Sequence, residues 1–208
     1  MLLTLPQSAG FLAAATVITL APGPDNMMVL ALGAARGSRS GMIFGLGCAA
    51  GCLWHSLLAA FGLGAVLLAS PQAFFLLRLF GGAYLIWLGL GAWRQGEAAG
   101  PVPTLAEDSS WRMFRQGLLA NAINPKVVLF FLSFLPQFVL LDQEPISRQI
   151  MGLGLLFSVQ AAFWFSLLAS CSGYLGQWLS KEPGRARWLG RMTALLFFLL
   201  GFRIIFWG

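Results

Sequence analysis

Charged residues are scarce in this chain. Of its 208 residues only 10% are Asp, Glu, Lys or Arg, whereas 58% are hydrophobic, and the mean hydropathy is +0.79. A soluble domain of this length needs far more polar surface, so the composition excludes one. Each membrane-spanning helix needs roughly 20 apolar residues, and the chain supplies such runs repeatedly. The sequence therefore predicts an all-α integral protein of the lipid bilayer.

Cysteine and histidine are also rare: the chain has three cysteines and one histidine. Cys48, Cys52 and Cys171 fall within apolar runs, and their odd number favours packing residues over a disulfide framework. Cys48, Cys52 and His55 share one helical face, where soft ligands can bind zinc, copper(I) or cadmium. The small residues around them equally suit close helix packing. We expect packing and no cofactor, with a metal site as the alternative.

Six apolar runs predict six transmembrane helices. The N-terminus lacks the basic start and small-residue cleavage site of a secretory signal, so we expect the first run to be retained. Segment 94–112, rich in Gly, Pro, Ser and acidic residues, is the expected cytoplasmic linker between two units of three spans, 1–93 and 113–208. The predicted spans are roughly 5–35, 41–69, 72–93, 113–141, 149–179 and 187–207.

Basic residues gather in alternate connections. The first, third and fifth connections, with their helix edges, hold nine, whereas the second and fourth hold only Arg148. Because Lys and Arg favour the cytoplasmic side, we expect the odd connections in the cytoplasm and both termini outside. The net charge of +6 thus reflects membrane topology and does not indicate nucleic-acid binding. The nine residues are Arg36, Arg39, Arg94, Arg112, Arg115, Lys181, Arg185, Arg187 and Arg191.

The first span is interrupted by residues that break helices. Pro22 and Pro24 lack N–H groups and displace their predecessors from helical angles. Gly23 between them accepts angles that other residues refuse. We expect one helix to end before this motif and another to begin at Pro24, a favoured first helical position. Asp25 then lies in the first turn, where the helix dipole favours an anion.

The fourth span carries a matching interruption at Asn124 and Pro125. When Pro24 is aligned with Pro125, Asp25 falls on Lys126, and an apolar helical run follows in both places. Unpaired backbone groups are tolerated at membrane depth only where protein covers them or water reaches them. We therefore expect the two breaks to face one another around one polar chamber.

A shared pattern in the second and fifth spans indicates a duplication. These spans contain LWHSLLAA at 53–60 and FWFSLLAS at 163–170. Because a unit of three spans is odd, its second copy must enter the membrane from the opposite side. The sequence therefore predicts two inverted three-helix repeats, the architecture of secondary transporters in which paired interrupted helices mark the substrate site.

Asp25 and Lys126 are the charged residues expected within this chamber. An aspartate at the centre of a membrane helix costs about 2.5–3.5 kcal/mol, of which the helix dipole offsets only about 0.3–1 kcal/mol. Asp25 is thus either a first-turn anion with a partner, or a ligand for a substrate ammonium. Lys126 either forms a permanent pair with Asp25 or binds a substrate carboxylate. An amino acid brings both charges and would satisfy both residues.

Four side-chain amides complete the candidate binding set. They belong to Asn26, Asn121, Asn124 and Gln160. The asparagines either cap backbone groups that the breaks leave free or bind cargo. Gln160 has no charged neighbour in its span, and either links helices or lines the chamber.

These motifs together resemble the lysine exporter (LysE/RhtB-type) superfamily. The resemblance rests on PGPDN in the first span and NxxNPKxxLFFLSFLPQF in the fourth, and it covers the whole chain. It implies a proton-driven exporter of amino acids or close derivatives in the bacterial inner membrane, with Asp25 as the candidate proton carrier. The family signatures map onto Pro22, Gly23, Pro24 and Asp25, and onto Asn124, Pro125 and Lys126.

We therefore expect a secondary active exporter that works by alternating access. One carboxylate and one ammonium suit a small neutral amino acid, whereas a basic cargo would favour a further acid. One alternative is a soft divalent-cation exporter of the same superfamily, dependent on Cys48, Cys52 and His55. Another is a non-transporting membrane scaffold or enzyme, although no serine is paired with a base. The glycine-rich faces would also permit a homo-oligomer.

Overall fold

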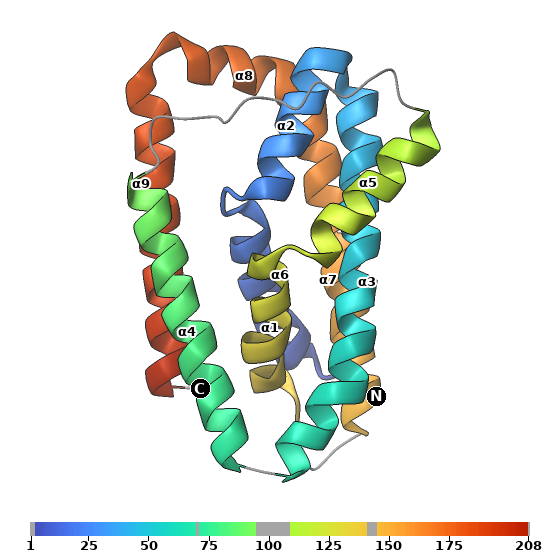
Figure 1. The fold of residues 1–208 in the computed structure, drawn as a ribbon, viewed down its shortest axis with the longest axis vertical. Coiled ribbons are helices and arrows are strands. Elements are labelled where there is room, and N and C mark those ends of the chain that lie inside the picture. The colour runs from blue at the N-terminus through green and yellow to red at the C-terminus, as the bar shows by residue number, and fades with distance from the viewer. Residues whose placement is uncertain (1–2, 70, 95–108, 141–144, 208) are drawn as a thin grey trace.

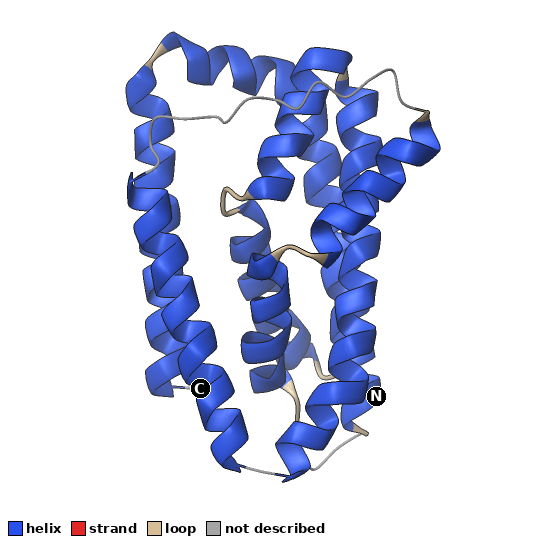
Figure 2. Cartoon of the chain, viewed as in Figure 1, coloured by secondary structure: helices blue, strands red, loops and turns tan. Residues whose placement is uncertain are grey.

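The computed structural model describes residues 3–69, 71–94, 109–140 and 145–207. These residues form helices and short connections without any strand, which confirms the all-α prediction (Figure 2). The helices are α1 (Leu5–Leu20), α2 (Pro24–Arg36), α3 (Ser38–Ala69), α4 (Pro71–Arg94), α5 (Ser110–Ala122), α6 (Pro125–Leu129), the π-helix η1 (Phe130–Phe134), the 3-10 helix η2 (Leu135–Phe138), α7 (Ile146–Ser170), α8 (Ser172–Lys181) and α9 (Pro183–Trp207).

Several of these helices can cross a membrane. Three are long and apolar enough by themselves, at Ser38–Gly62, Ile146–Ser170 and Arg187–Phe206. Two bent pairs raise the number to five among the described residues: α1 with α2, bent by 60°, and α5 with Pro125–Phe138, bent by 50°. The chain is thus a multi-pass membrane protein. Helix α4 covers the predicted span 72–93, but it is not among these candidates, so six spans remain a prediction.

The first predicted break is present. Helix α1 ends at Leu20, Gly23 is extended with φ −163°, and α2 begins at Pro24. The missing proline N–H does no harm there, because the first N–H groups of a helix have no partner within the helix.

The second predicted break is also present, but the segment after it differs from the expected regular helix. Asn124 caps α6, which makes only five residues before the backbone widens into η1 and then tightens into η2. Pro136 explains the change, since a proline removes the bond to the carbonyl four residues earlier and clashes with it. The π-helical turn accommodates this lost bond.

The predicted fifth span, 149–179, is wrong in its C-terminal part. Helix α7 ends at Ser170, and α8 is a separate helix that lies across one end of the molecule between α7 and α9 (Figure 1). The hydroxyl of Ser172 donates to Ala169 O at 2.7 Å and so satisfies a carbonyl at the end of α7. Gly173 follows, with its low helix propensity. Such side-chain bonds compete with the helical ladder and favour the turn.

The broken spans lie between two helix pairs. Helix α3 packs along α7, and α4 packs along α9. In Figure 1 helices α1, α2 and α6 run between these pairs, and α5 crosses α3. Both termini lie toward one end, which we call the terminal end. Helix α8 and the junction of α2 with α3 lie at the opposite end. This arrangement matches the separation of basic and non-basic connections expected from charge.

Glycines bring particular helices into backbone contact. A Cβ on Gly47 of α3 would collide with the carbonyl of Phe114 in α5, and one on Gly117 of α5 would collide with the carbonyl of Phe44 in α3. Small residues allow this approach between membrane helices. Beyond the break, a Cβ on Gly81 of α4 would collide with the side chain of Ser133 in η1. The part before the break is therefore packed on α3, whereas the part after it contacts both α4 and α3.

Candidate functional site

The two breaks meet at one small pocket. Both charged residues predicted for the chamber line it, although they come from opposite halves of the chain. The space open to the centre of a water-sized sphere is about 10 Å³, which is room for about one water molecule. The pocket is lined by Ile18, Thr19, Asp25, Cys52, Asn121, Lys126, Val127, Phe157 and Phe165.

Asp25 is held at the pocket by a residue of the other break. Its side chain is buried, with the residue 2% exposed, and Oδ2 accepts a hydrogen bond of 2.7 Å from Asn121 Nδ2. Its other oxygen, Oδ1, has no hydrogen-bond partner within the described part of the chain. The carboxylate thus keeps one acceptor for a further donor.

Lys126 reaches across to the end of α1. The residue is 5% exposed, and Nζ donates to Ala21 O at 2.9 Å. Gly23 makes room for it, because a Cβ there would lie 2.8 Å from Nζ. No ion pair within 4.0 Å joins Lys126 to Asp25 in the described structure. In this conformation the ammonium therefore caps a carbonyl, and the permanent pair considered from the sequence is absent.

Two of the predicted asparagines cap the breaks. Asn26 Nδ2 donates to Thr19 O at 2.8 Å and also lies within hydrogen-bond distance of Ala21 O. Asn124 Oδ1 accepts from Lys126 N at 3.0 Å. Asn26 Oδ1 and Asn124 Nδ2 have no partner among the described residues. Each amide therefore satisfies the broken backbone with one end and leaves the other end unused.

Asn121 contacts three other residues of the site. Besides binding Asp25, its Oδ1 lies 3.5 Å from Cys52 Sγ, and its backbone oxygen lies 3.0 Å from His55 Nε2. The His55 ring packs against Phe131, with centroids 5.6 Å apart. No sequence pattern indicated that His55 supports Asn121, because the two are 66 residues apart and belong to different spans.

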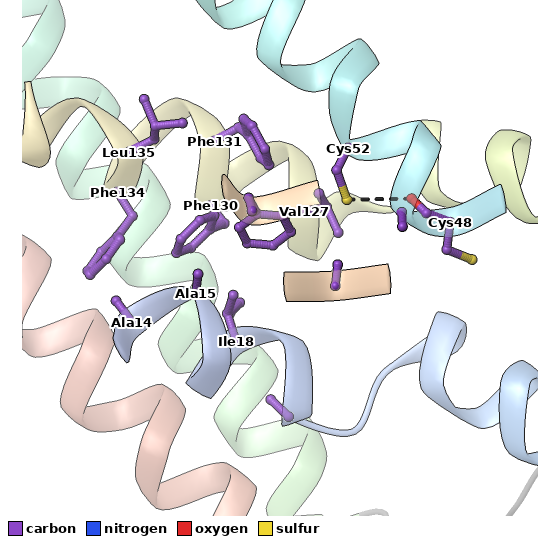
Figure 3. Packing of buried hydrophobic residues seen from close by; sticks show 14 of the residues in the cluster. Ala14, Ala15, Ile18, Cys48, Cys52, Val127, Phe130, Phe131, Phe134 and Leu135 are labelled. Atoms are coloured by element: carbon purple, nitrogen blue, oxygen red, sulfur yellow. Dashed lines mark hydrogen bonds between the residues drawn. The ribbon is translucent and has the colours of Figure 1, made fainter. Parts of the chain in front are cut away.

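The cysteine–histidine face is not arranged around a metal ion. Cys52 Sγ donates to Cys48 O at 3.5 Å, as the dashed line in Figure 3 shows. The described residues contain no group of three or more His, Cys, Asp or Glu side chains that could hold a metal. The geometry favours the packing interpretation of Cys48, Cys52 and His55.

Gln160 joins the pocket through a neighbour. Its Nε2 donates to Thr19 Oγ1 at 2.8 Å, and Thr19 lines the pocket. The bond links α7 to α1, as one of the two predicted roles required, while Oε1 is without a partner in the described residues.

One acid and one base thus lie at the two interrupted helices. A comparison with known protein families then matches nearly the whole sequence. The family model for the LysE type translocator matches residues 16–208. The chain belongs to the LysE type translocator family. This confirms the resemblance carried by the PGPDN and NPK motifs, and it identifies a transporter rather than an enzyme.

Relatives of this translocator include proteins named for efflux. The homoserine/homoserine lactone efflux protein of Salmonella typhimurium is 31% identical over 194 residues, 92% of each chain. The threonine efflux protein of Escherichia coli is 28% identical over 193 residues, 91% of this chain and 92% of the relative. An uncharacterized membrane protein of Pseudomonas aeruginosa is 33% identical over 172 residues, 79% of each chain. No solved structure matches the translocator.

Proposed function

We propose that this protein exports amino acids or close derivatives, with small neutral cargo favoured, across the bacterial inner membrane. The observation that carries the proposal is the pocket shared by Asp25 and Lys126, one acid and one base that do not pair with each other. The names of the homoserine and threonine efflux relatives support the same class of cargo.

The free hydrogen-bonding groups of the pocket suit a zwitterion. Asp25 Oδ1 offers an acceptor to a cargo ammonium, and Lys126 Nζ offers charged donors to a cargo carboxylate, where charge-assisted hydrogen bonds are strong. Asn121 holds Asp25 in place, and Gln160 acts on the pocket through Thr19. Asn26 and Asn124 contribute their unused amide ends. Intramembrane ionisable residues commonly serve substrate pathways in this way.

Cargo entry requires the pocket to enlarge. Space for about one water does not hold an amino acid, so the pocket must widen as the protein alternates between states open to either side. Lys126 leaves Ala21 O to meet the cargo carboxylate, while Asp25 meets the ammonium. A proton carried by Asp25 after cargo release then resets the exporter, coupling export to the proton gradient.

The architecture that we propose for this cycle is two inverted repeats, 1–93 and 113–208, joined by the cytoplasmic linker 94–112. Residues 95–108 of the linker lie outside the described part of the chain. The paired breaks, bent by 60° and 50°, support the repeat. The two termini lie toward the same end, which supports an even number of spans (Figure 1). The placement of both termini outside rests on the distribution of basic residues.

The proposal is tested by counterflow of labelled amino acids in proteoliposomes. Asp25→Asn and Lys126→Met should each lower exchange by about 10- to 100-fold, since each removes a hydrogen bond between a charged group and the cargo, which contributes about 1.5–3 kcal/mol. Glu182→Gln is the matched control, because this exposed acid pairs with Arg185 away from the pocket. Near-normal exchange by both pocket variants would contradict the proposal.

The cargo is identified by screening the twenty amino acids, homoserine and cadmium ions in the same assay. We expect exchange with homoserine and small neutral amino acids, and none with lysine or arginine, because the pocket offers a single acid. Cadmium flux lost in Cys52→Ser would instead establish the soft-cation alternative.

A further inference from the structure

Two buried glutamines meet at the terminal end of the molecule. Gln7 comes from α1 and is 8% exposed; Gln149 comes from α7 and is 1% exposed. Gln7 Nε2 donates to Gln149 Oε1 at 2.9 Å and to Phe138 O at 2.6 Å. Gln7 therefore binds the carbonyl at the end of the fourth span, and Gln149 holds Gln7 in place.

Gln149 also binds the backbone beyond Phe138. Its Nε2 donates to Leu140 O at 2.8 Å, and its Oε1 accepts from Leu140 N at 3.0 Å. Phe138 ends η2, and Val139 is extended, so this backbone has no helical ladder of its own beyond the last turn. We call Gln7, Gln149 and the backbone of Phe138 and Leu140 the glutamine latch.

An unbroken series of aromatic contacts leads from the glutamine latch to the pocket. The ring of Phe138 meets the edge of Phe11 at 5.5 Å, and Phe11 lies 6.1 Å from Phe130. Phe130 lies 5.2 Å from Phe157, which lines the pocket. Phe134 fills the space beside them, 5.1 Å from Phe130. We call Phe11, Phe130, Phe134 and Phe138 the aromatic plug; it rests on Phe157.

The aromatic plug is densely packed against α1. Figure 3 shows Phe130 and Phe134 beside Ala14, Ala15 and Ile18. Phe11, Phe130 and Phe134 are buried, with at most 1% exposed. Cargo could not pass this packing without movement of η1 and η2 away from α1.

We propose that the glutamine latch and the aromatic plug are the gate that closes the transport path at the terminal end. This inference rests on the proposed export by alternating access. The gate lies on the side where an exporter with external termini must release its cargo. Release of the glutamine latch would free η2, and η1 would shift with it because the two are continuous. Single π-helical turns of this kind are often found at functional sites. The plug then withdraws from Phe157.

The native thiol of Cys52 allows a direct test, because it lines the pocket behind the plug. Replacing Cys48 and Cys171 by alanine leaves Cys52 as the only cysteine, and neither residue lines the pocket. Cys48→Ala also keeps the backbone carbonyl that Cys52 bonds. The rate of Cys52 modification by a charged, membrane-impermeant methanethiosulfonate is then measured from each side of oriented vesicles. Protease cleavage of a C-terminal tag reports which side carries the termini.

Gln7→Leu and Gln149→Leu should each raise the modification rate from the terminal side by about tenfold or more, as the open population grows. The rate from the opposite side should remain within about twofold. The double variant should not exceed the larger single effect by much, because side chains acting in one network are non-additive. Gln149→Glu, which keeps the acceptor for Leu140 N but places a carboxylate oxygen against Leu140 O, should raise the rate at least as much as Gln149→Leu.

Gln137→Leu is the matched control. Gln137 is adjacent to Phe138, but its Nε2 donates to Ser133 O within the same span. An unchanged rate in Gln7→Leu and Gln149→Leu would overturn the gate. So would an equal rise from both sides, or an equal rise in Gln137→Leu, since a general loss of packing gives both. Should Gln149→Leu fail to accumulate in the membrane, Gln7→Asn carries the same expectation, because its shortened amide cannot reach Phe138 O.

Modification of Cys52 needs neither cargo nor a gradient, so the gate and the export proposal can fail separately. Side-selective modification without amino-acid counterflow would support the gate and contradict the proposed amino-acid cargo. Counterflow without side-selective modification would support the proposed export and contradict the gate.

Discussion

At the first break the buried polar atoms that face the site are acceptors, the carbonyl of Ala21 and the carboxylate of Asp25. At the second they are donors, the ammonium of Lys126 and the amide of Asn121. Asn26 and Asn124 satisfy part of the backbone within each break, but Asp25 and Lys126 find their partners across the site. A buried acceptor or donor without a partner costs about 1–3 kcal/mol. The two breaks are therefore stable as a pair, and each depends on the other half of the chain.

The helices after the breaks differ as well. Helix α2 continues regularly for 13 residues, whereas α6 gives way after five residues to a π-helix and a 3-10 helix. The regular half-helix presents the acid, and the irregular one presents the base beside the segment that we propose to move. The two sequence motifs are similar, but in the structure one presents the acid and the other presents the base.

The largest effect is expected from exchanging the two charges. In the double variant Asp25→Lys with Lys126→Asp, the carboxylate at position 126 would face the carbonyl oxygen of Ala21. Both groups are hydrogen-bond acceptors, so they could not bond. We expect counterflow to fall by about 100-fold or more, as for a buried charge without its partner. Recovery to within a few-fold of wild type, at equal abundance in the membrane, would mean that the two residues act as an interchangeable ion pair and that the donor–acceptor division is wrong.

Variants of Asn121 and Asn124 distinguish a residue that holds the charged site from one that caps a helix. Asn121→Leu removes the donor to Asp25 Oδ2, and a loss of about 1–3 kcal/mol should lower counterflow by about 10- to 100-fold. Asn124→Asp keeps the oxygen that caps α6, since Asp and Asn are similar N-caps, and loses only the amide donor Nδ2. Export should therefore fall by no more than about tenfold, the effect of one neutral hydrogen bond. Equal losses in the two variants, measured by initial exchange rate, would remove the distinction.

Gly23→Ala tests the space left for Lys126. The added Cβ would lie 2.8 Å from Nζ and 3.2 Å from Cε, while the extended backbone at Gly23 accepts alanine. Displacing the ammonium from Ala21 O should lower counterflow by about tenfold, in keeping with about 1–3 kcal/mol for overpacking. Gly91→Ala, where a Cβ meets nothing within 4 Å, is the control. Unchanged exchange in Gly23→Ala would show that the position of Nζ is not critical.

The smallest effect is expected at Gln160, which belongs to neither break. Gln160→Leu removes one hydrogen bond to Thr19 and should lower the free energy of unfolding in detergent by about 1 kcal/mol. Exchange should change by no more than about threefold, since the residue reaches the pocket only through Thr19. A loss as large as that of Asn121→Leu would make Gln160 a direct ligand of the cargo.

Local backbone chemistry made the breaks predictable. Proline has no N–H, so Pro24 and Pro125 determine where helices begin whatever surrounds them. Aligning the two motifs also placed Asp25 and Lys126 in one chamber, as the pocket lining shows. These features depend on a few adjacent residues.

The partners of the side chains were not predictable in the same way. The bond of Asn121 to Asp25 joins positions 96 apart, and that of Lys126 to Ala21 joins positions 105 apart. Such contacts depend on the relative placement of whole helices, which hydropathy does not determine. The π-helix was missed because its cause, Pro136, lies within an otherwise continuous apolar run.

The glycine contacts of the fourth span have a mechanical consequence. The part before the break rests on α3 through Gly47 and Gly117, and the part after it rests on α4 through Gly81. A displacement of α3 relative to α4 would therefore act on the short joint between α5 and α6, immediately before Lys126. Such a displacement would change which groups the Lys126 ammonium can reach.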